Sequence, residues 1–259
     1  MDSCVVTGGA RGIGRGIAEQ LVVRGHHVVI TDIDGEGAAR TAAEIGAAEG
    51  LAQDVRDAAS HREVAAAAAR HGVLTAWFNN AGVGFDGTLS ELSEEQVRTL
   101  VEVNLLGVMW GTRAAVEAFG RGGGDVVLTA SLSGLGPVPG LSAYAATKAA
   151  VVSLAMSVNM ETPRNVRVHA LCPDGVATPM LDAMKEDGQA KRLVHSGGRL
   201  LSIEEIAAEA VGLVGSRRVV RTVPTWRAGA MRATSLLPSL AQGGLEVFAA
   251  QGRRALRRR

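Results

Sequence analysis

Residues 4–14 read CVVTGGARGIG, a short β-branched run that leads directly into a glycine-rich loop. A helix-like apolar pattern begins inside the loop and continues to about residue 24. Glycines allow a tight turn and a close approach of backbone N–H groups, and the N-terminus of a helix attracts anions. These residues therefore predict a strand, a phosphate-binding loop and a helix, which together form the first unit of a dinucleotide-binding fold.

An acidic residue ends the next β-branched run, which covers residues 27–31. Asp32 lies twenty residues after Gly12, where a carboxylate can accept hydrogen bonds from the ribose hydroxyls of a bound adenosine. The alternative is an aspartate that caps the following helix, a role for which Asp34 is also a candidate. The strand before the loop and the helix after it favour the nucleotide interpretation.

Strand-like and helix-like segments alternate along the chain. We expect strands at 4–7, 27–31, 50–53, 74–79, 125–129, 166–171 and 218–223, and helices at about 12–24, 36–48, 57–71, 93–119, 143–161 and 203–214. Ser93 with Gln96 and Ser202 with Glu205 have the spacing of capping boxes. The alternation predicts an α/β fold: a Rossmann-like, doubly wound parallel sheet of about seven strands with helices on both faces, in three α/β/α layers. Ligands of such sheets bind beyond the carboxyl ends of the strands.

The composition is that of a globular protein. Apolar residues make up 47% of the 259-residue chain, and no apolar run approaches the roughly 20 residues that cross a bilayer. Cys4 and Cys172 lie in strand-like runs and indicate a reducing compartment without a disulfide framework. A strand and a glycine loop occupy the N-terminal segment, so no signal peptide is expected. We therefore expect a cytoplasmic protein, and we expect no metal site.

The charge is distributed unevenly. Residues 1–215 contain 17 Lys and Arg against 25 Asp and Glu, whereas residues 216–259 contain ten Arg against the single Glu246. We find no repeat and no linker before residue 215. We therefore predict a Rossmann-fold domain that carries the site over 1–215, and the last strand plus a basic C-terminal extension over 216–259.

The only tyrosine, Tyr144, precedes one of three lysines, Lys148, by four residues in the helix-like segment 142–150. Residues four apart share a helix face. At an effective dielectric of about 20, a lysine charge about 4 Å away favours phenolate by about 4 kcal/mol and lowers a phenol pKa of about 10 by about three. A tyrosine near neutrality can exchange protons with a substrate oxygen. The alternative is a chance pair on a solvated helix face.

Several motifs, in their order and spacing, resemble those of the short-chain dehydrogenase/reductase family over residues 4 to about 180. They are T-G-x-x-x-G-x-G at Thr7, Gly8, Gly12 and Gly14, N-N-A-G at 79–82, a helix asparagine at Asn104, a serine at Ser131 thirteen residues before the tyrosine, and Y-x-x-x-K at Tyr144 and Lys148. The resemblance implies an oxidoreductase that interconverts a secondary alcohol and a ketone by hydride transfer. It also implies a homo-oligomer, either a dimer or a tetramer.

The resemblance implies roles for individual residues. Tyr144 would be the general acid/base, Ser131 would hydrogen-bond the substrate oxygen, Lys148 would lower the phenol pKa and bind the nicotinamide ribose, and Asn104 would position a water that relays protons to solvent. The implied cofactor site comprises Gly8, Arg11, Gly12, Ile13, Gly14, Asp32, Ile33, Asp54, Val55, Asn80, Ala81, Gly82, Tyr144, Lys148, Pro173, Val176 and Thr178.

We expect NAD rather than NADP as the cofactor. Arg11 could meet a 2′-phosphate, but Asp32 would repel one because like charges a few ångströms apart disfavour each other. Neither Ile33 nor Asp34 offers a positive charge to offset that repulsion.

Two residues depart from the family pattern near the expected nicotinamide loop, residues 172–180. Asp174 stands where glycine is usual, which leaves the local backbone turn open, and His169 replaces the common asparagine and is interpreted as a structural group. The substrate lid that the resemblance implies covers about 179–199. Its apolar residues, with Leu135, Val138 and Leu141, indicate an apolar pocket. The lid charges Lys185, Lys191, Arg192 and His195 are expected to be solvated, with a contact to a substrate carboxylate as the alternative.

The basic extension has two interpretations. Its interleaved apolar residues and arginines suit an anionic membrane surface, but they equally suit a helix that packs on its own domain or on a partner subunit. Aromatic residues at 3% disfavour nucleic acid as a partner. The alternative to an enzyme that acts on a small alcohol or ketone is a dinucleotide-binding sensor or scaffold whose tail engages a membrane or partner. Because tyrosine, lysine and serine are all present, the enzyme is favoured.

Overall fold

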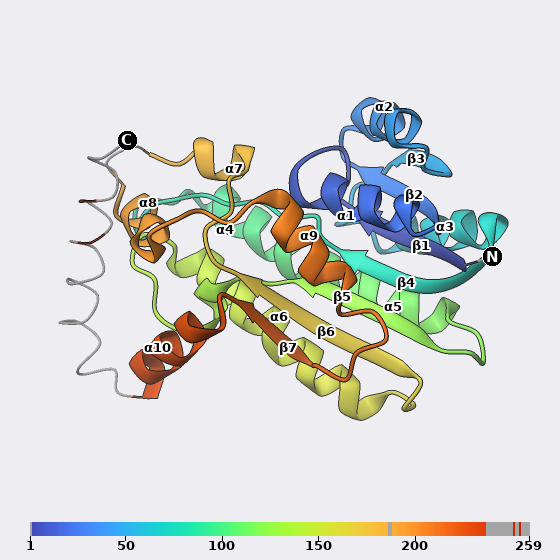
Figure 1. Ribbon diagram of the computed structural model, residues 1–259. Coiled ribbons are helices and arrows are strands. Elements are labelled where there is room, and N and C mark those ends of the chain that lie inside the picture. The colour runs from blue at the N-terminus through green and yellow to red at the C-terminus, as the bar shows by residue number, and fades with distance from the viewer. Residues whose placement is uncertain (1, 186–187, 237–250, 252–253, 255–259) are drawn as a thin grey trace.

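The computed structural model describes residues 2–185, 188–236, 251 and 254. Within them, seven parallel strands form one sheet in the order β3-β2-β1-β4-β5-β6-β7 (Figure 1). The strands are β1 (Asp2–Thr7), β2 (His27–Asp32), β3 (Glu49–Ala52), β4 (Val73–Asn79), β5 (Gly124–Thr129), β6 (Val166–Pro173) and β7 (Val220–Val223). The predicted doubly wound fold is confirmed. Strand order reverses between β1 and β4, which is the place where such sheets bind ligands.

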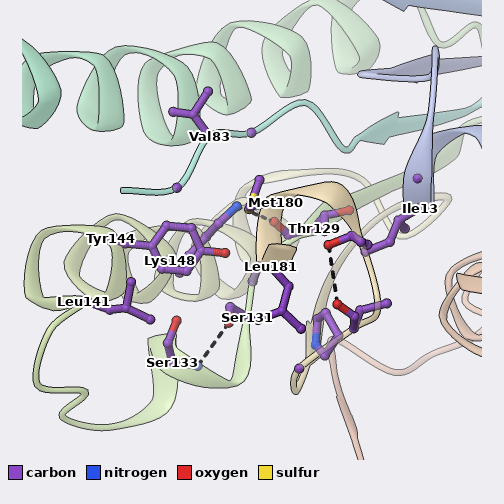
Figure 2. Close-up of a pocket in the computed structure, with 18 of the residues that line it drawn as sticks. Ile13, Val83, Thr129, Ser131, Ser133, Leu141, Tyr144, Lys148, Met180 and Leu181 are labelled. Atoms are coloured by element: carbon purple, nitrogen blue, oxygen red, sulfur yellow. Dashed lines mark hydrogen bonds between the residues drawn. The ribbon is translucent and has the colours of Figure 1, made fainter. Parts of the chain in front are cut away.

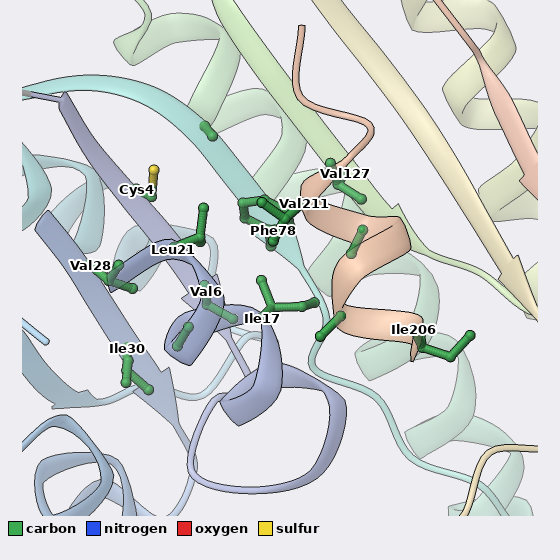
Figure 3. Close-up of a cluster of buried hydrophobic side chains, with 14 of the residues drawn as sticks. Cys4, Val6, Ile17, Leu21, Val28, Ile30, Phe78, Val127, Ile206 and Val211 are labelled. Carbon is green, nitrogen blue, oxygen red and sulfur yellow. The ribbon is translucent and has the colours of Figure 1, made fainter. Parts of the chain in front are cut away.

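Helices cover both faces of the sheet. On one face lie α1 (Gly12–Val23), α2 (Gly35–Ile45) and α9 (Ile203–Val211), and on the other lie α3 (Ala58–His71), α5 (Val108–Ala118) and α6 (Ser142–Glu161). Successive strand residues supply opposite faces, so that Val6 joins the first core and Val5 the second. Figure 3 shows the first core, in which Ile17 and Leu21 of α1 and Ile206 of α9 meet apolar strand residues. Burial on both faces explains why the strands read as nearly continuous apolar runs.

The predicted element boundaries differ from the structure by a few residues, for local reasons. Helix α2 ends at Ile45, because Gly46 adopts a left-handed conformation with φ of 75°. The segment predicted as one helix over 93–119 contains α4 (Glu94–Val101), a π-helical stretch η1 (Glu102–Gly107) and then α5. Both predicted capping boxes are confirmed.

Several further elements lie beyond the carboxyl ends of the strands. They are the 3₁₀ turn η2 (Leu132–Leu135), the lid elements α7 (Pro179–Asp182), α8 (Gln189–Val194) and η3 (His195–Gly197), and α10 (Thr225–Leu236) (Figure 1). The sequence predicted a lid over about 179–199 and, as one alternative, a helix in the basic extension, but no element at 132–135. Helix α10 packs on η2: the Ser235 hydroxyl donates to the Leu135 carbonyl at 2.9 Å, and a Cβ at Gly136 would lie 2.7 Å from the Met231 carbonyl oxygen. No room remains there for a side chain.

The first part of the predicted basic extension is therefore a helix against the protein's own domain. Its arginine-rich remainder, 237–259, lies outside the described residues except for Gln251 and Arg254, so the membrane interpretation stays a prediction. In the described part of the chain, no helix has both the length and the apolar character that crossing a membrane requires.

Candidate active site

A cavity of about 880 Å³ opens at the carboxyl ends of the strands, between the glycine loop, the lid and α10. The structure brings nearly all predicted site residues to it. Those that line it are Gly8, Arg11, Gly12, Ile13, Asp32, Ile33, Asp54, Val55, Asn80, Ala81, Gly82, Ser131, Tyr144, Lys148, Pro173, Val176 and Thr178. Gly14 and Asn104 do not line the cavity and act on it only through neighbours.

The glycine loop has the shape of an anion cradle. Gly12 is left-handed, with φ of 58°, and a Cβ there would meet nothing within 4 Å, so its backbone faces open space. Gly14 is closely packed instead: a Cβ would lie 2.6 Å from Asn80 Nδ2 and closer still to the Gly8 carbonyl oxygen. Helix α1 starts at Gly12 and has no acidic residue in its first turn. These residues fit a pyrophosphate at a helix N-terminus.

Thr7 and Asn80 join the ends of three strands. The Thr7 hydroxyl oxygen accepts from the backbone N–H groups of Asn80 and Ala81, both at 3.1 Å. The Asn80 amide nitrogen donates to the Thr7 and Gly8 carbonyls, and its oxygen accepts from the Thr129 hydroxyl. Uncharged hydrogen bonds thus hold together the loops after β1 and β4, where the strand order reverses.

Acidic residues lie at the end of the cavity where the adenosine is predicted to bind. One Asp32 carboxylate oxygen accepts from Ala10 N and the other from Asp34 N, both at 3.1 Å, so the side chain is held at the end of β2. Asp34 itself caps α2 by accepting from Gly37 N. Both carboxylate oxygens of Asp54 bind Arg56, which lines the cavity and was not predicted. The guanidinium holds the pKa of Asp54 below its usual range.

The catalytic candidates meet on the opposite side (Figure 2). Tyr144 comes from the first turn of α6, and Ser131 ends the loop after β5 as the N-cap of η2. Burial raises the pKa of Tyr144 to about 12, and a hydrogen bond with Ser131 opposes this only in part. The prediction of a phenol titrating near neutrality is therefore wrong for this geometry.

The position of Lys148 explains the difference. Its Nζ donates to the Thr129 carbonyl at 2.8 Å and lies 5.6 Å from the centroid of the Tyr144 ring, over the ring rather than against the hydroxyl. Only 3% of Lys148 is exposed, and burial lowers its pKa to about 8. Desolvation thus disfavours the charged forms of both partners, and the spacing of the two residues in the sequence does not reveal it.

Asn104 contacts the backbone of the loop that follows β4, outside the cavity lining. It is fully buried in the π-helical stretch η1, where its Oδ1 accepts from Val83 N at 2.9 Å and its Nδ2 donates to Val83 O at 2.8 Å. A Cβ at Gly82 would lie 3.2 Å from Asn104 Oδ1 and 3.6 Å from Lys148 Nζ. Asn104 thereby fixes the loop next to the lysine, and its role in holding a water stays a prediction.

The loop with the unusual Asp174 needs no left-handed backbone, because no residue other than glycine has positive φ in the described residues. Asp174 instead forms a buried ion pair with Arg227 of α10, and both line the cavity with Trp226, Ala230 and Met231. Sequence reasoning missed these four α10 residues. The available signal was Asp174 itself, since an acid that replaces glycine in a buried loop needs a cation.

The lid supplies apolar lining from Met180, Leu181, Leu193 and Val194. The expectation that His195 is solvated is wrong: it is buried, and its Nδ1 bonds the Lys191 carbonyl oxygen. His169 is buried on β6 between Asp125 and the Arg218 carbonyl, as expected of a structural group.

Comparison with known proteins agrees with this geometry. The family model described as short chain dehydrogenase matches residues 3–189. The chain belongs to that family. Among short-chain dehydrogenases, the 2,5-dichloro-2,5-cyclohexadiene-1,4-diol dehydrogenase of Sphingobium indicum is 38% identical, with 68% of this chain and 73% of the relative covered. The sorbitol dehydrogenase of Cereibacter sphaeroides is 36% identical over 82% of this chain and 89% of its own. The cyclohexanol dehydrogenase of an Acinetobacter species is 33% identical over 78% and 83%.

Two solved structures share the architecture. A short-chain dehydrogenase/reductase from Burkholderia phymatum in complex with NAD has a TM-score of 0.82 and 29% identity, covering 93% of this chain and 95% of its own. An alcohol dehydrogenase from Thermococcus sibiricus complexed with 5-hydroxy-NADP has a TM-score of 0.72 and 29% identity, covering 86% and 95%. The protein is accordingly a short-chain dehydrogenase-type oxidoreductase, and the neighbours include both cofactor types.

Proposed function

We propose that this oxidoreductase interconverts a cyclic secondary alcohol and its ketone with NAD(H), using Tyr144 as the proton donor and acceptor. The observation that carries the proposal is the convergence of Tyr144, Ser131 and Lys148 on one cavity that also holds a phosphate cradle. The nicotinamide, when bound, supplies or accepts the hydride. The protein's own groups then bind the oxygen and move its proton.

The pKa of Tyr144 suits a proton donor. At neutral pH a phenol with a pKa of about 12 is protonated, which is the form needed when a carbonyl oxygen gains a proton during reduction. In the oxidation direction the phenol must first lose its proton, and the phenolate oxygen then accepts the proton of the alcohol hydroxyl. Ser131 lies next to the Tyr144 hydroxyl and would hold the substrate oxygen there. Lys148, held by Thr129, places a positive charge over the Tyr144 ring and would bind the ribose hydroxyls of the nicotinamide nucleotide.

NAD is supported by the charges at the end of β2. Asp32 lines the cavity, and the nearby Arg40 lies between Asp34 and Glu36, 3.9 and 3.8 Å from their carboxylates. Arg11 remains the one basic residue of the loop that could approach a phosphate. A 2′-phosphate there would meet more negative than positive charge.

The cyclic substrate class is supported by two observations. The walls beyond Tyr144 are mainly apolar, with Val138, Leu141 and Met231 among them. Two of the relatives described above are named for six-membered cyclic alcohols. A sensor or scaffold without turnover is not favoured, because the catalytic candidates converge and the named relatives are dehydrogenases.

We also propose a cytoplasmic homo-oligomer, in which exposed Met156 and Met160 of α6 would be covered.

Absorbance of NADH at steady state tests the function. We expect cyclohexanol and related ring alcohols to reduce NAD, and Tyr144→Phe to lower kcat/KM by about 10²- to 10⁴-fold, the usual contribution of acid–base catalysis. Affinity for NADH, measured by fluorescence, should change little in the variant. Turnover that persists in Tyr144→Phe would exclude the proposed role.

A further inference from the structure

Ser133 carries a hydroxyl group that the fold leaves without a partner. It lies in η2, lines the cavity and is only 9% exposed, yet its Oγ has no hydrogen-bond partner. Buried hydroxyl groups in folded proteins almost always have one. In Figure 2 the Ser133 hydroxyl points to the side of Leu141 and Tyr144. The unpaired hydroxyl therefore lies at the substrate end of the cavity, with its oxygen enclosed by neighbouring atoms.

The neighbouring polar groups are already engaged. The backbone N–H of Ser133 donates to Ser131 Oγ at 3.2 Å, and the Ser131 side chain also bonds Tyr144. The Ser131 hydroxyl is thereby directed to the reacting oxygen, while Ser133, two residues later, is left to contact something else. Leu141, on the side to which the hydroxyl points in Figure 2, is apolar and offers no partner, and neither do the further lining residues Val138 and Met231.

Such a lone hydroxyl discriminates between ligands. An apolar ligand seated against it leaves the hydroxyl unpaired and gains nothing from this group. A ligand with an oxygen at that point supplies the hydrogen bond that the hydroxyl lacks. Because α10 packs against η2 and closes this end of the cavity, the hydroxyl cannot turn to bulk solvent once a ligand is seated.

We propose that Ser133 Oγ binds a second oxygen of the substrate, so that the enzyme selects a cyclic secondary alcohol that carries another hydroxyl or carbonyl group, such as a cyclic diol or hydroxyketone. The inference rests on the proposed function and extends it from the reacting oxygen to the rest of the ring. One oxygen lies at Tyr144 and Ser131, and the other lies at Ser133.

The test compares cyclohexanol with the cis and trans isomers of 1,2-, 1,3- and 1,4-cyclohexanediol. We expect the wild-type protein to prefer at least one diol, and Ser133→Ala to lower the ratio of kcat/KM for that diol to kcat/KM for cyclohexanol by about three- to tenfold, the effect of losing one neutral hydrogen bond. The matched control is Ser153→Ala, an exposed serine on α6, which should leave the ratio unchanged. An unchanged ratio in Ser133→Ala, or a wild-type protein that prefers cyclohexanol to every diol, overturns the proposal.

Binding separates this inference from the proposed function. If the wild-type protein oxidises none of the ring alcohols, the proposed function fails, and the Ser133 inference is judged by Kd instead. Diols and cyclohexanol are then titrated into the NADH-saturated protein and followed by thermal shift. Tighter binding of a diol that is lost in Ser133→Ala supports the second-oxygen site, and equal binding of diol and cyclohexanol overturns it. The melting temperature of Ser133→Ala should not fall, because its Oγ bonds nothing in the fold.

Discussion

Arg227 Nε lies 2.9 Å from Asp174 Oδ2, with the two side chains only 9% and 11% exposed. The two Nη atoms of Arg227 also donate to the Ser196 hydroxyl, at 3.2 and 3.1 Å. One guanidinium therefore joins three segments: the loop after β6, the lid and α10. Burial raises the pKa of Asp174 in spite of the arginine, so the pair is costly to bury and sensitive to the loss of either member.

Replacement of Arg227 by methionine should destabilise the fold and loosen the substrate end of the cavity. Breaking a buried pair leaves one uncompensated charge and costs about 3–5 kcal/mol, which corresponds to a fall in melting temperature of about 6–20 °C for a domain of this size. Differential scanning calorimetry measures the fall, and steady-state kinetics should show a higher KM for the alcohol. The double variant Asp174→Asn/Arg227→Met should recover at least half of the lost stability. Additive losses would show that the two residues do not act as a pair.

Asp32 should control the choice between NAD and NADP. Asp32→Asn removes the charge while the amide oxygen can still accept from Ala10 or Asp34 N. We expect the ratio of kcat/KM with NADP to that with NAD to rise at least about tenfold, since a like charge a few ångströms away costs more than about 1.4 kcal/mol. Asp34→Asn, in the exposed cap of α2, is the matched control and should change the ratio less. A wild-type protein that uses NADPH as well as NADH would refute the NAD assignment.

Gly14 should be intolerant of any side chain. Alanine at this position would place its Cβ 2.6 Å from Asn80 Nδ2 and against the Gly8 carbonyl, so the phosphate loop or the N-N-A-G segment must move. We expect the Kd for NADH, followed by fluorescence, to rise at least about tenfold, because a small misplacement of an anion cradle is costly. Gly122→Ala, where a Cβ would meet nothing within 4 Å, is the control and should bind NADH normally. Equal affinities for the two variants would contradict this reading of the loop.

Lys148 should give the protein a distinctive dependence of stability on pH. Burial lowers its pKa to about 8 from an ordinary 10.5, so folding releases a proton between these values and stability rises with pH over that window. The free energy of unfolding of the wild type relative to Lys148→Met should therefore increase by up to about 3 kcal/mol between pH 8 and 10.5. Denaturant titrations under reducing conditions measure it. Both proteins are compared in a Cys172→Ala background, because the charge of Lys148 also lowers the pKa of Cys172. A difference that stays flat across this range would mean that Lys148 is not desolvated.

Much of the fold was readable because its signals are local. Alternating β-branched runs and helical periodicity depend on neighbours two to four residues away, and the capping boxes at Ser93 and Ser202 depend on neighbours three residues away. Tyr144, Lys148 and Ser131 were also recognisable, because they stand at the spacing of the short-chain dehydrogenase motifs. The π-helical stretch at Asn104 was not, and its amide bonds Val83, which lies 21 residues away in the chain.

What the amino-acid sequence determined by itself was the parallel sheet, the glycine cradle and the identity of the groups at the cavity. Only the tertiary structure decided the pKa values of those groups and which other residues line the cavity around them. Burial reversed the expected pKa of Tyr144, and a helix far along the chain brought Arg227 to Asp174. Desolvation and contacts between distant segments depend on the whole packed molecule, so no local pattern could have shown them.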